Sequence, residues 1–213
     1  MSTRPDIAYI TQFLLQSNKN PTQRDWIAGK RVLRYLKGTK DLGIVYRRDR
    51  EQGVEHDHMI PWGYCDTNYA EDLCDRKSTS GYVFMLANGS ILWKSKKQTS
   101  IALSTTEAEY YALGIACQEA VWLKQLCQEV FMPLDKPIHI FSDNTGAVAL
   151  SDNPVFHNRS KHIDIRWHFV WDLIHSKIIH SSHIPRVQNG ADVLTKALNR
   201  FEHVRCLKLL GME

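Results

Sequence analysis

The stretch SGYVFMLANGSILWKSK, residues 80–96, decides the fold, because it predicts a β-hairpin in front of a long helix. Two runs rich in aromatic and aliphatic residues flank Asn88-Gly89, and Asn-Gly between such runs is the strongest short-range hairpin signal. The residues from about 105 to 130 then predict one long helix. A hairpin followed by a helix starts a sheet whose later strands return through helices, so we expect an α/β fold.

The segments on either side of this unit extend the same pattern. PWGYCDTN (residues 61–68) is a short apolar run that predicts a strand, and further strands are expected in IHIFSD (138–143) and IIHSSHIP (178–185). Helices are expected in the remaining segments, which are NTGAVALSD (144–152), RSKHIDIRWHFVWDLIHSK (159–177) and NGADVLTKAL (189–198). The expected order is β-β-β-α-β-α-α-β-α, which predicts a mixed sheet flanked by helices.

The first 60 residues read as a separate unit. RPDIAYITQFLLQ (residues 4–16) and NPTQRDWIAGKRVLRYLKG (20–38) predict two helices, and LGIVYR (42–47) predicts a strand. Residues 49–60 are polar and contain a glycine, so we interpret them as a linker or a long hairpin loop. We therefore expect a small α/β extension over residues 1–60 and a second domain over residues 61–213.

Composition limits the classes of protein that fit. The 213 residues are 43% hydrophobic, which suffices for one sizeable core. No apolar run reaches membrane-spanning length and the N-terminus lacks the pattern of a signal peptide, so no membrane partner is expected. The five scattered cysteines fit free thiols in a reducing compartment. Residues 1–60 hold 11 Lys and Arg against 7 Asp and Glu, while residues 61–213 hold 16 of each, so an anionic polymer is a plausible partner.

Four acidic residues occupy positions that favour a shared site. Asp66 and Asp143 each end an expected strand, Glu109 lies one turn into the long helix, and Asp192 lies in the first turn of the last expected helix. Sites in such folds gather at the carboxyl ends of parallel strands. Clustered carboxylates need counter-charge, which hard divalent cations such as Mg²⁺ supply. Two such ions would suit phosphodiester hydrolysis by water.

The residues alone leave the role of Glu109 open. With Thr106 as the N-cap, Glu109 is the third helical residue and completes a capping box, while Glu107 is a favourable first-turn charge facing water. Alternatively, Glu109 turns inward to the other three acids.

Six blocks in order resemble the ribonuclease H domain of copia-type (Pseudoviridae) LTR retrotransposons: GYCDTNYAED, DRKSTSGYVF, WKSKKQTSIALSTTEAEYYAL, FSDNTGA, RSKHIDIRWHFV and ADVLTK. The upstream RPDIAYITQFL and WIAGKRVLRYLKGTKDLGIVY resemble the thumb and connection that end the reverse transcriptase of the same polyprotein. The resemblance covers nearly the whole chain. It implies a ribonuclease H-like fold, a five-stranded mixed sheet flanked by helices.

The resemblance implies an activity and its residues. The activity is endonucleolytic hydrolysis of the RNA strand of RNA/DNA hybrids, which leaves 3′-hydroxyl and 5′-phosphate ends. The acidic tetrad of the family falls on Asp66, Glu109, Asp143 and Asp192, which would hold two Mg²⁺ ions, with Mn²⁺ able to substitute. The partners implied are the hybrid and the polymerase domain of the parent polyprotein. The expected location is intracellular, in cytoplasmic virus-like particles or the nucleus.

Further positions are candidates for substrate binding. In related enzymes the residues just before the helical glutamate contact the minor groove and its 2′-hydroxyls, and the alternative role of such residues is helix capping. Basic residues near the site entrance or on the helix at 159–177 could follow phosphates, although each also fits an exposed position. The candidates are Ser104, Thr105, Thr106, Lys94, Lys96, Lys97, Arg159, Lys161 and Arg166. His183 is the nearest candidate for the mobile histidine of cellular ribonucleases H, and it is expected to lie on a strand.

Three other interpretations stay open. The chain could be a retroelement-derived module that binds nucleic acid without cutting it. It could be a transposase or integrase, although those use three acids and usually end with a glutamate on a late helix. A structural interpretation makes residues 1–60 an interface to a polymerase, in which case exposed apolar residues such as Trp26 would cause self-association.

Overall fold

A mixed five-stranded sheet with the order β3-β2-β1-β4-β5 forms the centre of the molecule. The computed structural model describes residues 3–47, 60–130, 134–152 and 161–213, and within the last range it describes side chains from residue 166 onward. The strands are β1 (Trp62–Asn68), β2 (Thr79–Leu86), β3 (Gly89–Lys97), β4 (Ile138–Ser142) and β5 (Ile179–His183). The first three pair antiparallel, and β4 and β5 extend the sheet parallel to β1. The topology confirms the expected ribonuclease H-like fold.

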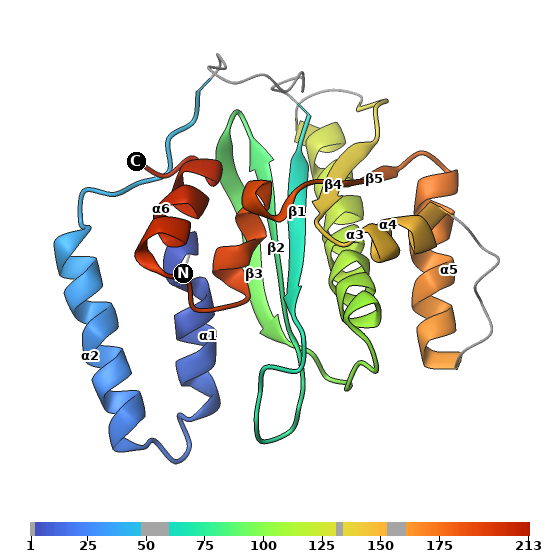
Figure 1. Ribbon diagram of the computed structural model, residues 1–213. Coiled ribbons are helices and arrows are strands. Elements are labelled where there is room, and N and C mark those ends of the chain that lie inside the picture. Colours follow the sequence, from blue (N-terminus) through green and yellow to red (C-terminus); the bar gives the residue numbers. More distant parts are fainter. Residues whose placement is uncertain (1–2, 48–59, 131–133, 153–160) are drawn as a thin grey trace.

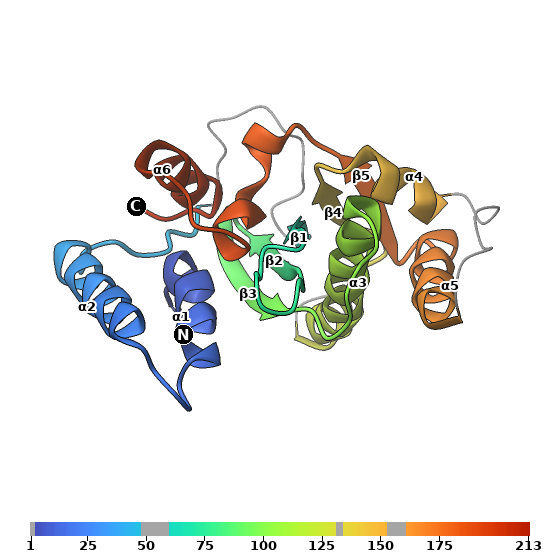
Figure 2. The ribbon, with the colours of Figure 1, turned by 60° about the horizontal axis from the view of Figure 1, so that its bottom comes forward.

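Alternating side chains on the strands build two cores, one on each face of the sheet. On β2, Phe84 packs with the long helix α3 (Thr105–Val130), whereas its neighbours Val83 and Met85 face the other side. Period-two alternation of this kind is expected when both faces of a strand are covered. Figure 1 shows α3 and α5 (Lys161–His175) on one side of the sheet and α1 (Ala8–Gln16) and α6 (Arg200–Leu209) on the other, and the view in Figure 2 agrees.

The long helix α3 begins and ends at the residues expected from the sequence, and α4 (Thr145–Asp152) and α5 follow it in the expected order. The prediction for the last helix was wrong. Instead of a helix over residues 189–198, the chain forms a short 3₁₀ helix, η4 (Gly190–Leu194), and then α6. The reason lies in capping: Asn199 accepts a hydrogen bond from the backbone N–H of Glu202 at 2.9 Å, which starts a new helix.

The N-terminal extension packs on the sheet and on the C-terminal segment. The expected helices are present as η1 (Pro5–Ile7) with α1 and as α2 (Gln23–Gly38), and α2 begins with a capping box between Thr22 and Asp25. The prediction of a strand over residues 42–47 was wrong, because only the isolated bridge Ile44–Met212 forms there. The backbone of residues 43–45 forms hydrogen bonds with residues 211–213, and this partner segment is too short for a longer strand.

Two further features complete the fold. No helix in the described part of the chain is long and apolar enough to cross a membrane.

The segment after α2 joins the core on the α1 and α6 side of the sheet. Its residues Leu42 and Ile44 pack against buried residues of the C-terminal helix region. The residues between 48 and 59, the expected linker, lie outside the described part of the chain.

Candidate active site

Asp66 sits on the central strand, where burial makes its charge costly. It belongs to β1, its residue is 1% exposed, and it lies opposite Gly81 of β2. The hydroxyl of Thr195 donates a hydrogen bond to Asp66 Oδ2, and the ammonium of Lys196 lies 3.2 Å from the same oxygen. A carboxylate in such a position requires hydrogen bonds or counter-charge, and both come from the turn after η4.

The start of α3 decides between the two roles considered for Glu109. Ser104 caps the helix, because its hydroxyl accepts a hydrogen bond from the N–H of Glu107 at 3.1 Å. The carboxylate of Glu107 in turn accepts the N–H of Leu103 at 2.8 Å. The capping pair is therefore Ser104 with Glu107, not Thr106 with Glu109, and Glu107 serves the helix start. Glu109 is 8% exposed and turns into the molecule.

Three carboxylates converge at the carboxyl end of the parallel strands. Asp143 follows β4, the neighbour of β1 in the sheet, and its side chain meets those of Asp66 and Glu109. One oxygen from each of the three lies within 4.8 Å of the others. Oε2 of Glu109 has no hydrogen-bond partner among the described residues although it is buried. Oxygen donors at this spacing fit a hard divalent cation such as Mg²⁺.

The electrostatics of these three groups follow from burial and mutual repulsion. Burial, together with the charges of Asp66 and Asp143, raises the pKa of Glu109 to about 9, against the opposing effect of Lys196. Burial and the Asp66 charge also raise the pKa of Asp143, against the opposing effect of Lys196. Two of the three carboxyls therefore hold protons more strongly than usual, and a bound cation would release those protons.

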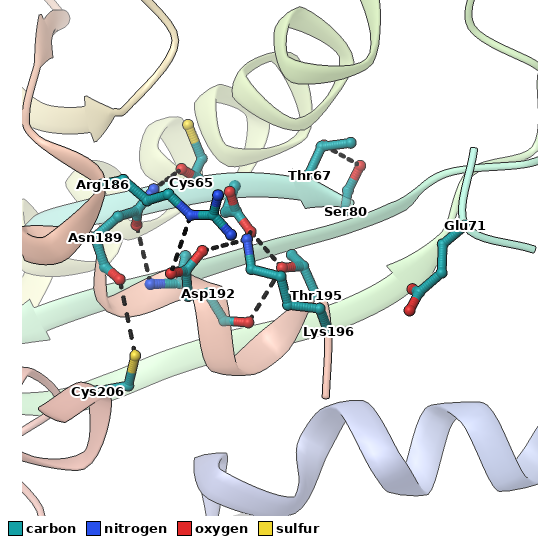
Figure 3. Close-up of polar contacts among 12 residues, drawn as sticks. Cys65, Thr67, Glu71, Ser80, Arg186, Asn189, Asp192, Thr195, Lys196 and Cys206 are labelled. Carbon is teal, nitrogen blue, oxygen red and sulfur yellow. Dashed lines mark hydrogen bonds and ion pairs between the residues drawn. The ribbon is translucent and has the colours of Figure 1, made fainter. Parts of the chain in front are cut away.

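Asp192 lies beside this trio, with cations on both of its oxygens. Lys196 forms an ion pair with Oδ1 and Arg186 lies 4.0 Å from Oδ2 (Figure 3). Arg205 also lies 3.4 Å from Oδ2. The ammonium of Lys196 also reaches Asp66, so it connects Asp192 with the trio. Burial, and then the Asp66 charge, raise the pKa of Asp192, and Lys196 opposes this. All four predicted acids thus lie close together. Three of them, Asp66, Glu109 and Asp143, form one cluster, and Asp192 is connected to this cluster through Lys196.

Asn189 fixes the backbone next to Asp192, and Gly81 leaves room for η4; neither role was predicted from the sequence. The Asn189 amide donates to the carbonyl of Cys65 at 2.9 Å and accepts the N–H of Ala191 at 3.0 Å, in full burial (Figure 3). At Gly81 a Cβ would lie 2.7 Å from Cβ of Leu194, so glycine makes room for η4 above the sheet. Asn189 just before the expected helix was a usable capping signal, whereas the role of Gly81 required the packing.

The predicted substrate-binding residues are only partly available for contact. Ser104 and Thr105 are exposed at the start of α3 and Thr106 is half-buried, with Ser104 acting as the cap. The lysines on β3 differ among themselves. Lys96 is exposed, Lys94 lies 3.6 Å from Glu119, and Lys97 is paired with Asp72 and, at 2.9 Å, with Asp75.

The remaining predictions for this part of the chain concern α5 and the end of β5. Arg159 lies outside the described residues, and Lys161 begins α5 with a side chain that is also outside them. His183 lies on β5 as expected, is exposed, and pairs in register with Ser142 next to Asp143.

A hollow beside the start of α3 is lined by polar and aromatic side chains, among them Gln98, Ser100, Tyr111 and Arg166. The guanidinium of Arg166 lies 3.7 Å from the centre of the Tyr111 ring, a cation–π contact. Gly114 permits it, because a Cβ there would lie 2.6 Å from Cδ of Arg166. A glycine inside a helix lowers stability by about 0.5–1 kcal/mol relative to alanine, so close packing of Arg166 gives this position a structural purpose.

The fold and the carboxylate centre define the class of the protein as a ribonuclease H-like domain. Comparisons with known proteins then indicate which ribonuclease H-like proteins the chain is similar to. The chain is 37% identical over 210 residues, 99% of its length, to the retrovirus-related Pol polyprotein from transposon TNT 1-94 of Nicotiana tabacum, and 39% identical over 210 residues, also 99% of its length, to that from transposon RE2 of Arabidopsis thaliana. Its homologues over its whole length are thus Pol polyproteins of plant copia-type retrotransposons, which confirms the resemblance of the sequence blocks.

The other comparisons add context. The chain spans only 15% and 14% of the length of those two polyproteins. It is also 46% identical over 121 residues, 57% of this chain and 80% of the relative, to the secreted RxLR effector protein 161 of Plasmopara viticola. A solved structure of LC11-RNase H1, isolated from compost, is 18% identical with a TM-score of 0.48, covering 64% of this chain and 92% of that one. No family model matches the chain.

Proposed function

We propose that this chain is a metal-dependent ribonuclease H that hydrolyses the RNA strand of RNA/DNA hybrids. The observation that carries the proposal is the convergence of Asp66, Glu109 and Asp143 within 4.8 Å, with Asp192 joined to them through Lys196. Similarity to retrotransposon Pol polyproteins supports the choice of substrate, because reverse transcription produces such hybrids. The fold supports it further by placing the acids at the carboxyl end of the parallel strands.

The residues would act through charge and position. Asp66, Glu109 and Asp143 would hold divalent cations, for which we propose two Mg²⁺ ions with Mn²⁺ able to substitute, and Asp192 would complete the set. When bound, the ions would activate the attacking water and stabilise the leaving 3′ oxygen, giving 3′-hydroxyl and 5′-phosphate ends. The chain orients the acids through strand, helix and 3₁₀ backbones, so the backbone around the acids needs little rearrangement on binding.

Nucleic-acid contacts are proposed on the same side of the molecule. The exposed hydroxyls of Ser104 and Thr105 lie five and four residues before Glu109, where they could meet 2′-hydroxyls of the RNA strand. Lys96 and Arg166 supply positive charge near this helix start, and their attraction for phosphates is independent of sequence. Lys94, Lys97, Arg159 and Lys161 remain proposals, and the first two would first have to leave their acidic partners.

The proposal extends to context. We propose that residues 61–213 form the nuclease domain, and that residues 1–60 correspond to the reverse transcriptase thumb and connection. The exposed apolar side chains of Trp26 and Leu33 on α2, which are 63% and 66% exposed, fit contact with the polymerase domain of the parent polyprotein. The proposed location is intracellular, in cytoplasmic virus-like particles or in the nucleus.

The test is cleavage of an end-labelled RNA/DNA hybrid with Mg²⁺ or Mn²⁺, beside single-stranded RNA, duplex RNA and duplex DNA. We expect cleavage of the hybrid alone, loss of activity in chelator, and loss in Asp143→Asn. Asp172→Asn, which removes an exposed acid from α5, is the matched control and should cut normally. If the folded protein binds hybrid without cutting it under any of these conditions, the proposal is wrong and the chain is a binding module.

A further inference from the structure

Lys196 is a built-in cation at one edge of the carboxylate centre. Its ammonium lies 3.2 Å from Asp66 Oδ2 and forms an ion pair with Asp192 Oδ1 (Figure 3). Its side chain is only 15% exposed, although a lysine normally keeps its charged end in water. The lysine is held here by sequence spacing, because Asp192 and Lys196 are four residues apart, and by the backbone bond from Lys196 N–H to the Asp192 carbonyl at 3.3 Å.

The two parts of the centre differ in how their charge is balanced. Asp192 has Lys196 on Oδ1, with Arg205 and Arg186 near Oδ2. Among the described residues of the trio, only Asp66 forms an ion pair, and its partner is also Lys196. Within the part of the chain that the structure describes, the Glu109 and Asp143 side therefore keeps carboxylate oxygens that form no ion pair, whereas the Asp66–Asp192 edge is already bridged by a positive charge.

We propose that Lys196 occupies the position of a cation at the Asp66–Asp192 edge, so that a divalent ion can bridge these two acids only after the ammonium has been displaced. The inference rests on the proposed metal site, but it concerns the order and strength of ion binding. An ion held by Asp66, Glu109 and Asp143 would bind first, and an ion at the Asp66–Asp192 edge would bind more weakly. The four-carbon stem of lysine gives the ammonium room to swing into solvent.

The second position would thus be filled only when something offsets the displaced charge. The anionic phosphate of a bound strand is the chemistry that could do so, because it would accept the ammonium of Lys196 as a new partner. Lys196 would then couple substrate binding to the completion of the metal site. Without that anion, the lysine would offset part of the negative charge at this edge and would weaken the repulsion between Asp66 and Asp192.

Lys196→Met tests the proposal, because methionine keeps the length and removes the charge. Mn²⁺ binding would be measured without substrate, by calorimetry and by electron paramagnetic resonance of the free ion. We expect the weaker of two ions to bind at least about tenfold more tightly in the variant, the usual minimum effect of removing one nearby charge. The tighter ion should gain less, because Lys196 contacts only one of its three acids.

Matched variants make the outcome specific. Lys208→Met removes an exposed lysine of the same charge from α6 and should leave both affinities unchanged. In an Asp192→Asn background the Lys196→Met effect on the weaker ion should disappear, because the bridging acid is gone. If Lys196→Met alone does not fold, the double variant Lys196→Met/Asp192→Asn, which removes one positive and one negative charge together and so keeps the net charge of the centre, should fold and bind a single ion.

The result that overturns the proposal is an unchanged or weaker Mn²⁺ affinity in folded Lys196→Met, including no detectable binding in either protein. A double variant that still binds two ions would overturn it as well. These readouts do not depend on cleavage. Failure of hybrid cleavage with a tightened second ion would refute the proposed function and leave the role of Lys196 intact.

Discussion

At the scale of single residues, the buried amide of Asn189 connects the two ends of the site. It donates to the Cys65 carbonyl next to Asp66, and it accepts the N–H of Ala191 next to Asp192. The relative position of Asp66 and Asp192 therefore depends on one side chain that touches neither of these two carboxylates, although it also forms a hydrogen bond with Asp143. Such a group acts as a positioning residue, because it fixes backbone rather than contacting an ion.

Asn189→Ala should lower stability and metal affinity together. The substitution leaves a buried carbonyl and a buried N–H without partners, which costs about 1–3 kcal/mol. For a protein of this size that corresponds to a fall in Tm of about 2–4 °C for each kcal/mol. Thermal unfolding and Mn²⁺ calorimetry would measure both effects. Gln188→Ala, at the exposed neighbouring position, is the control, and an equal effect in both variants would contradict the role of Asn189.

The residue scale also shows what the sequence could predict of the site. The four acids could be identified because each falls at the end of a strand or the start of a helix, or matches a block of the family. The capping pair Ser104–Glu107 could not be chosen over Thr106–Glu109, since both fit the same spacing rule. The bridging position of Lys196 depends on the side-chain geometry of the folded state.

At the scale of elements, η4 approaches the sheet over a glycine. The register places Gly81 opposite Asp66, and the missing Cβ leaves space for Leu194 and Thr195. The short 3₁₀ geometry of η4 thus belongs to the same arrangement that brings Thr195 and Lys196 onto Asp66. A longer helix over these residues, as the sequence pattern favours, would have aimed the side chains differently.

Gly81→Ala should therefore disturb the site more than its size suggests. The new Cβ would lie 2.7 Å from Leu194 Cβ and 2.8 Å from Thr195 Cγ2, so η4 must shift. Overpacking of this kind costs about 1–3 kcal/mol, and Mn²⁺ affinity should fall with it. Gly29→Ala in α2 is the matched control: its Cβ meets no atom within 4 Å, so it should raise stability by about 0.4–1 kcal/mol. Equal effects of the two variants on Mn²⁺ affinity would contradict this account.

The elements show why most of the fold was predictable and two parts were not. The hairpin, the long helix and the parallel strands carry strong local signals and appear where they were expected. The segment 42–47 has strand-like residues, but its partner is a short C-terminal segment that only the tertiary structure brings to it. The helix α6 was missed because its Asn199 cap follows directly on a segment that itself resembles a helix.

At the scale of the whole molecule, the carboxylate centre should make stability depend on pH. Glu109 has an ordinary value of 4.5 and a pKa of about 9 in the folded protein, so the folded state binds this proton more strongly than the unfolded state. Its contribution to stability is complete below about pH 4.5 and is lost as the pH rises to about 9. The charges of Asp66 and Asp143 reinforce this rise in the pKa of Glu109, and the charge of Lys196 opposes it.

In chelator, the Tm of the wild type should consequently fall between pH 5 and pH 9, and Glu109→Gln should remove much of that fall. The variant should be the more stable protein at pH 9, since a neutral amide needs no counter-charge in a buried position. Saturating Mn²⁺ should reverse the pH dependence for the wild type alone, because the cation stabilises the ionised acids. Parallel pH profiles for wild type and variant in chelator would refute the assignment.

The most direct test of the central claim compares two glutamates that lie two residues apart on the same helix. Single-turnover cleavage of an RNA/DNA hybrid in Mg²⁺ would be measured for Glu109→Gln and Glu107→Gln. We predict that Glu109→Gln loses at least about a hundredfold in rate, as expected when a principal electrostatic group is removed. Glu107→Gln should stay near the wild-type rate, because glutamine also serves in a capping box. Normal cleavage by Glu109→Gln, or an equal loss in both variants, would contradict the account.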